Sequence, residues 1–248
     1  MARFGVIKTV SAAALFVQSL AAASAAKPVL LELFTSEGCS SCPPADALLQ
    51  KLDKDQPLDG VELIVLSEHV DYWNHGGWKD PYSSRAISER QEAYARQLGT
   101  EDIYTPQLVV DGTREVVGSN WPKAKGAILR SIERPKLPVI LSLQRTGERE
   151  QLHIEVPPSG DVPRGDVYLA LATDRAPARV AQGENAGREL SHVAVLSSLK
   201  KIGSITATKG LSVDLPVSAK SERVSSRTIA FAENPANHQI LGAAQTKR

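Results

Sequence analysis

The most constraining feature of this sequence is its cysteine pair, because Cys39 and Cys42 are the only two cysteines in 248 residues. They stand two residues apart, between the apolar run 29–34 and the segment 45–52. A disulfide between them closes a very short ring, which removes little loop entropy and makes a weak structural staple. A Cys-x-x-Cys between a strand and a helix is typical of thioredoxin-type redox sites. The spacing therefore predicts a redox-active disulfide.

The N-terminus has the pattern of a secretory signal peptide. Arg3 and Lys8 are basic, residues 10–22 are apolar, and Ala-Ser-Ala at 23–25 fits a cleavage site. The apolar run is short for a membrane span of ~20 residues, and no later segment is long and apolar enough to cross a bilayer. We predict cleavage of residues 1–25 and a periplasmic or secreted mature chain, in a compartment where disulfides persist.

Composition narrows the choice of partners. The net charge is +1 and no Lys/Arg cluster stands out, so neither nucleic acid nor anionic lipid is an expected partner. A mature chain of this size does not need a disulfide to fold, which favours a catalytic role for the cysteine pair. We predict no cofactor and no resident metal. The expected partners are protein or low-molecular-weight thiols and a redox partner that recycles the disulfide.

The segment 27–134 alternates strand-like and helix-like patterns in the order β-α-β-α-β-β-α, which is that of a thioredoxin fold. The predicted strands and helices are Val29–Phe34, Pro43–Asp53, Val61–Leu66, Ser83–Leu98, Gln107–Val110, Glu115–Val117 and Trp121–Ile132. We predict an α/β thioredoxin-like N-terminal domain over residues 27–134.

The pattern changes after Arg134, where Pro135 and Pro138 bracket a predicted linker. Short alternating runs separated by turn residues follow, at Val139–Leu143, Gln151–Val156, Asp166–Ala172, His192–Leu196, Gly210–Leu215 and Arg227–Ala232. This spacing predicts an all-β sandwich-like C-terminal domain of about six or seven strands over residues 138–248.

In this predicted fold, loops from three strand ends meet at the cysteines. Cys39 is the expected attacking thiol, because a helix N-terminus stabilises a thiolate, and Cys42 is the expected resolving thiol. Glu32 has two interpretations, as the acceptor of the Cys42 proton or as a salt-bridged acid. Pro106 is predicted to be cis and to face the cysteines, so that the backbone of Thr105 is offered to an incoming peptide or cysteine.

Two further segments carry candidate substrate-binding residues. The loop 68–82 holds two of the three tryptophans, and His69, Asp71 and Trp73 within it either face substrate or form a small satellite core. The glycine-bracketed loop 182–189 either docks on the cysteine rim or binds a ligand, or is an ordinary turn. Its candidate residues are Glu184, Asn185 and Arg188.

With these residues in view, the chain resembles a family of secreted bacterial proteins of unknown function with a thioredoxin-like domain. The segments that carry the resemblance are 32–46 around Cys-Ser-Ser-Cys-Pro-Pro, 69–73, 77–81, 104–107 and 183–188. The resemblance implies a thioredoxin-like fold and export from the cytoplasm, and it raises the importance of the loop 183–188. It implies no substrate.

The leading functional hypothesis is an exported thiol–disulfide oxidoreductase. One alternative is a metal-binding or delivery module, in which the two thiolates and His69 or His75 hold copper(I). The other is a non-catalytic binding protein with a structural disulfide, in which the C-terminal segment provides recognition.

Overall fold

The computed structural model describes residues 26–100, 102–146, 149–161, 164–216 and 226–246. The predicted signal peptide, residues 1–25, lies outside them. The elements in chain order are β1 (Lys27–Thr35), α1 (Pro43–Asp55), β2 (Val61–His69), α2 (Arg85–Leu98), β3 (Gln107–Val110), β4 (Arg114–Val117), α3 (Trp121–Ser131), β5 (Ile140–Thr146), β6 (Arg149–Val156), β7 (Arg164–Arg179), β8 (Glu189–Thr206), β9 (Leu211–Pro216), β10 (Ser226–Glu233) and β11 (Ile240–Thr246).

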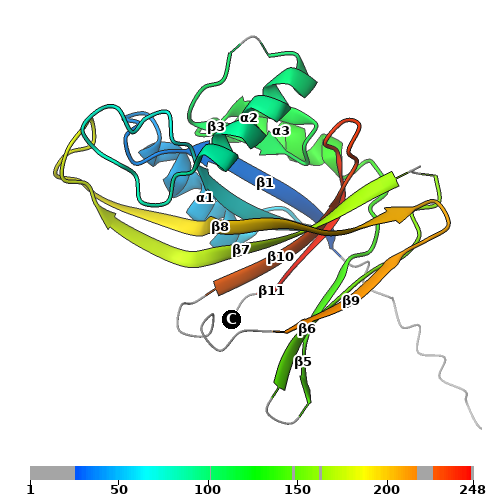
Figure 1. Cartoon of the computed structure of the whole chain (residues 1–248). Coiled ribbons are helices and arrows are strands. Elements are labelled where there is room, and N and C mark those ends of the chain that lie inside the picture. The colour runs from blue at the N-terminus through cyan, green and yellow to red at the C-terminus, as the bar shows by residue number, and fades with distance from the viewer. Residues whose placement is uncertain (1–25, 101, 147–148, 162–163, 217–225, 247–248) are drawn as a thin grey trace, which may run out of the picture.

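One mixed sheet of eight strands dominates the described molecule, in the order β11-β10-β7-β8-β2-β1-β3-β4 (Figure 1). A smaller sheet contains β5, β6 and β9. The predicted α/β thioredoxin-like N-terminal domain followed by an all-β sandwich-like C-terminal domain is therefore wrong. Strands from both halves of the chain share one sheet, and only three helices accompany the strands in the described residues.

The physical reason for the shared sheet lies in β2. Residues 63–66 of this strand are completely buried, so β2 is covered on both faces and a free edge here would leave buried amides and carbonyls unpaired. β8 lies along that edge, with a parallel pairing between Ser67 and Val195. The sheet then continues through β7, β10 and β11, and the main apolar core contains side chains from both halves, such as Leu30 and Phe231.

The length of β7 and β8 also differs from the prediction. The alternating runs at 166–172 and 192–196 are only parts of strands of 16 and 18 residues, which run side by side through the molecule in Figure 1. Register shifts after Val167 and Leu171 interrupt their pairing. Such bulges break the alternation of apolar and polar residues that marks a strand in a sequence. The sequence pattern therefore covers only part of each long strand.

The two helices nearest the cysteines cover opposite faces of the sheet. On β1, Thr35 contacts α1 through Asp46, whereas Glu32 contacts α2 through Tyr94. These side chains lie on opposite faces because successive residues of a strand alternate. α2 begins at the side-chain cap of Ser84 and ends at Gly99, a normal pair of helix-boundary signals.

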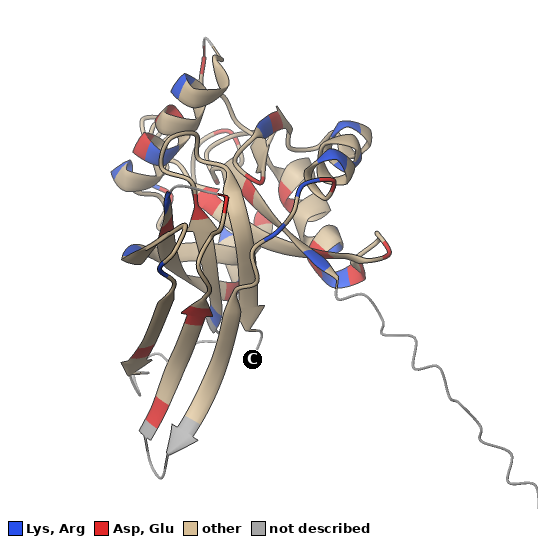
Figure 2. Cartoon of the chain, turned by 90° about the vertical axis from the view of Figure 1, so that its right-hand side faces the viewer, with Lys and Arg blue, Asp and Glu red and all other residues tan. Residues whose placement is uncertain are grey.

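The charged residues are mixed in sign. Figure 2 shows acidic and basic residues interspersed along the helices in view, in agreement with a net charge of +1. No helix in the described part of the chain has the length and apolarity needed to cross a membrane.

Candidate functional site

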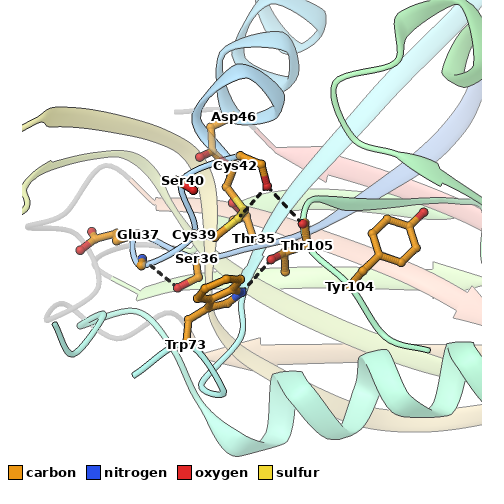
Figure 3. Close-up of a disulfide and its surroundings, with 12 residues drawn as sticks. Thr35, Ser36, Glu37, Cys39, Ser40, Cys42, Asp46, Trp73, Tyr104 and Thr105 are labelled. Carbon is orange, nitrogen blue, oxygen red and sulfur yellow. Dashed lines mark hydrogen bonds between the residues drawn. A yellow bond between two sulfur atoms is a disulfide. The ribbon is translucent and has the colours of Figure 1, made fainter. Parts of the chain in front are cut away.

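Cys39 and Cys42 form a disulfide between the end of β1 and the start of α1, as Figure 3 shows. Their Cα atoms are 5.4 Å apart, and both residues are fully buried. Cys42 is the N-cap of α1, and the prolines at 43 and 44 occupy the first helical positions. Because prolines have no N–H, this helix start offers a thiolate fewer amide donors than usual. We therefore expect only a moderate lowering of the pKa of Cys39 when the disulfide opens.

The Thr105–Pro106 peptide bond is cis, which confirms the predicted isomer. Ser41 Oγ donates to the Thr105 carbonyl oxygen over 3.5 Å and lies 3.4 Å from Cys39 Sγ. Trp73 Nε1 donates to Thr105 Oγ1 over 2.8 Å. The cysteine turn, the loop after β2 and the segment before β3 therefore meet at Thr105 (Figure 3).

Gly118, which was not among the residues predicted from the sequence, allows this segment to pack closely. Its amide donates to the Pro106 carbonyl oxygen over 2.9 Å. A Cβ at this position would lie 2.6 Å from Leu33 Cδ1, 3.0 Å from Ala45 Cβ and 3.2 Å from Pro106 Cβ. Only glycine leaves room for β1, α1 and the cis proline to approach one another.

The loop between β7 and β8 covers the cysteine turn. Asn185 is fully buried, and its Nδ2 donates to the carbonyl oxygens of Glu37 and Cys39, each over 2.9 Å. Glu184 is exposed, and its Oε2 accepts from the Ser40 amide over 3.1 Å. Hydrogen bonding by the side chain and then by the amide of Ser40 lowers the pKa of Glu184. Of the three possibilities for this loop, the geometry shows docking on the cysteine turn.

The third candidate in this loop, Arg188, lies further from the cysteines. Its side chain is exposed, and its backbone pairs with Val180 and Asn185. Gly183 and Gly187 both have positive φ angles, of 81° and 80°, which glycine adopts without steric cost. These two turns allow the loop to fold back and place Asn185 on the cysteine turn.

A buried group of ionisable side chains lies next to the disulfide, on the α1 face of the sheet. We call it the acid–histidine cluster; its members are Glu37, Asp46, His69, Asp80 and His192. His192 Nδ1 is 3.6 Å from Asp46 Oδ2, and His192 Nε2 is 3.8 Å from Glu37 Oε1. His69 Nδ1 is 2.7 Å from Asp80 Oδ2. The two imidazole rings meet edge to face, with centroids 4.6 Å apart.

The ionisable groups in this cluster shift one another's pKa values. Burial lowers the pKa of His192, but the neighbouring carboxyl groups of Asp46 and Glu37 outweigh it and hold that pKa above its usual value. Burial and the neighbouring Asp80 raise the pKa of Glu37. His192 thus lies between two carboxyl groups that favour its protonated form.

Among the predicted residues, Glu32 and Asp71 are not brought to the disulfide. Glu32 lies on the α2 face of the sheet, where its carboxylate binds Arg90 and accepts from Tyr94 OH over 2.6 Å. This is the salt-bridged alternative for Glu32. Asp71 accepts a hydrogen bond from Ser88 on α2.

Trp73 does border the site, whereas His69 is buried behind it with Asp80. Asp46 and His192 were not among the site residues predicted from the sequence. Asp46 could have been found, because it lies four residues after Cys42 and such residues share a helix face. No local signal marks His192, which comes from β8. In the described residues, no group of three or more His, Cys, Asp or Glu side chains has the geometry of a metal site.

The fold and site thus define a mixed β-sheet protein whose disulfide lies at a helix start, opposite a cis-proline peptide. The chain belongs to the family described as "Protein of unknown function (DUF1223)", whose model matches residues 30–233. The crystal structure of protein AGR_C_4864 from Agrobacterium tumefaciens is similar, with a TM-score of 0.70 and 28% identity over 90% of this chain and 95% of that one.

The structure of HBP35 of Porphyromonas gingivalis shares the fold, with a TM-score of 0.63 and 20% identity over 90% of this chain and 76% of that one. No curated protein sequence matches the chain.

Proposed function

We propose that this protein is a thiol–disulfide oxidoreductase that acts on protein or low-molecular-weight thiols through Cys39 and Cys42. The observation that carries the proposal is the position of the disulfide at the start of α1, joined by Ser41 to the carbonyl of the cis Thr105–Pro106 peptide. A short-ring disulfide at a helix N-terminus is suited to exchange, because the thiolate that forms there is stabilised.

In the proposed exchange, a substrate thiolate attacks Cys39 Sγ and the S–S bond breaks. The electron pair leaves on Cys42 Sγ, and Cys39 carries the mixed disulfide. The Ser41 hydroxyl, 3.4 Å from Cys39 Sγ, is placed to donate to a thiolate on Cys39. The Thr105 backbone lies beside the reacting sulfur and supports peptide binding. The signal pattern at residues 1–25 supports action in the periplasm or outside the cell, where a redox partner recycles the pair.

The burial of both cysteines favours a second candidate, a binding protein with a structural disulfide. In this case the loop that carries Asn185 stays closed, and the disulfide holds the turn between β1 and α1 in place. The two candidates differ in whether a thiol reaches Cys39.

A trapping experiment separates them. Cys42→Ser has no resolving thiol, so after incubation with glutathione disulfide we expect a stable glutathione adduct on Cys39, detected by intact mass. The matched control is Cys39→Ser, which removes the sulfur that lies 3.4 Å from the Ser41 hydroxyl; we expect about tenfold slower adduct formation, because Ser41 is placed to stabilise a thiolate on Cys39. Folded Cys42→Ser protein that gives no adduct would support the structural disulfide. Circular dichroism establishes that both variants are folded.

A further inference from the structure

The acid–histidine cluster contains several buried polar atoms that no protein group satisfies. They are Glu37 Oε1, Asp46 Oδ2, His69 Nε2 and both ring nitrogens of His192. Buried polar groups in native proteins are almost always hydrogen-bonded, so unpaired ones call for an explanation, and a redox or catalytic role is one. Their concentration in one place beside a disulfide is more informative than any one of them.

Ionisable groups face His192 from every element packed around it. Glu37 comes from the turn after β1, Asp46 from α1, His69 from β2, and Asp80 and Tyr82 from the loop before α2. His192 and His69 thus adjoin three carboxyl groups. Groups this close titrate as a coupled set, so a proton taken up or released there belongs to the set and not to one residue.

Asp46 connects this cluster to the disulfide. It lies one helical turn after Cys42, and its amide donates to the Cys42 carbonyl oxygen over 3.1 Å. One carboxylate oxygen accepts from Thr35 Oγ1 over 2.9 Å, and the other faces His192 Nδ1. Figure 3 shows Asp46 and Thr35 around the disulfide, on the side of Cys42. Asp46 therefore connects His192, which its carboxylate faces, to Cys42, to which its backbone is hydrogen-bonded.

We propose that Asp46 and His192 hold the proton that the Cys42 sulfur takes up when the disulfide opens. Asp46 carries this proton, and His192 is a positioning residue that acts through Asp46. The inference rests on the proposed exchange reaction. When a substrate thiolate attacks Cys39, the S–S electron pair leaves on Cys42, and a proton passes from His192 through Asp46 to the Cys42 sulfur. In reverse, the Cys42 thiol returns this proton to the cluster, and its thiolate attacks Cys39 Sγ and expels the substrate thiolate.

The test is a comparison of the His192 titration in the oxidised and the dithiothreitol-reduced full-length protein, followed by NMR of the imidazole carbons. Because Cys42 becomes a titrating neighbour on reduction, we expect the apparent pKa of His192 to differ by about half a pH unit or more between the two states. His153 is the internal control, since it is paired with Asp214 on the separate sheet. Its titration is expected to be unchanged.

Identical His192 titrations in both redox states would overturn the inference. Asp46→Asn gives a second readout: reduction of its disulfide by thiols should be slower than in the wild-type protein, and the redox-dependent difference at His192 should disappear. If Asp46→Asn does not fold, the wild-type comparison alone decides. A disulfide that thiols cannot reduce reversibly would instead overturn the proposed function, and the His192 comparison is then made on phosphine-reduced protein.

Discussion

Replacing Arg90 by glutamine is expected to lower the free energy of unfolding by about 3–5 kcal/mol, the usual cost of removing one partner from a buried charge group. Arg90 Nη2 lies 2.6 Å from Glu32 and 3.1 Å from Glu233, and its Nε lies 3.8 Å from Glu68. All three carboxyl groups are buried. Without the guanidinium they would be left close together in a poorly solvated site.

The matched control is Arg85→Gln on the same helix. The Arg85 side chain is 66% exposed and pairs with Glu89 and Glu92 at the surface, so its loss should destabilise the protein much less than the loss of Arg90. Urea denaturation at pH 7 measures both variants. Equal destabilisation of the two would contradict the account of the buried group.

The loss of stability caused by Arg90→Gln should become smaller at acidic pH. Burial raises the pKa of Glu233, but His238 and Arg90 outweigh it and hold the pKa below its usual value. A lowered pKa in the folded state gives stability that is present above the unfolded pKa and is lost as the pH falls. The wild-type protein therefore loses part of its advantage over the variant between about pH 5 and pH 3.

Replacing Asn185 by alanine is expected to speed reduction of the disulfide by dithiothreitol about tenfold or more. The variant loses two buried hydrogen bonds, to the carbonyls of Glu37 and Cys39, and each contributes about 1 kcal/mol to keeping the loop closed. A lower opening energy raises the fraction of molecules in which Cys39, which is fully buried, is open to attack. Thiol counting over time gives the rate.

Arg188→Ala is the control for this prediction, because Arg188 lies in the same loop and its side chain is exposed. Its reduction rate should stay within about twofold of the wild-type rate, as for most surface substitutions. An Asn185→Ala rate equal to that of Arg188→Ala would show that the loop does not limit access to the disulfide.

Local patterns in the sequence were sufficient for some features of this protein. The order of strands and helices up to residue 131 was predictable from periodicity, and α1 starts at Pro43 as its proline signal indicates. The cis Thr105–Pro106 bond was predictable from its position opposite the cysteines. Each of these depends on residues close together in the chain, where pattern and turn chemistry are informative.

The remaining features depend on long-range pairing. That β8 joins β2 is a contact between residues more than 120 positions apart, and no local pattern marks it. The same pairing brings His192 to Asp46. The role of Glu32 as acceptor of the Cys42 proton could have been rejected from its position in the strand. Glu32 and Thr35 are three residues apart, so their side chains lie on opposite faces of β1, and α1 packs on the Thr35 face.

The most direct test of the central claim is an equilibrium redox titration of the Cys39–Cys42 pair in the wild-type protein, with free thiols counted at each potential. The account predicts a reversible midpoint between about −120 and −270 mV, the range of working thiol–disulfide oxidoreductases. A pair that stays oxidised below about −300 mV would behave as a structural disulfide and would contradict the proposed function.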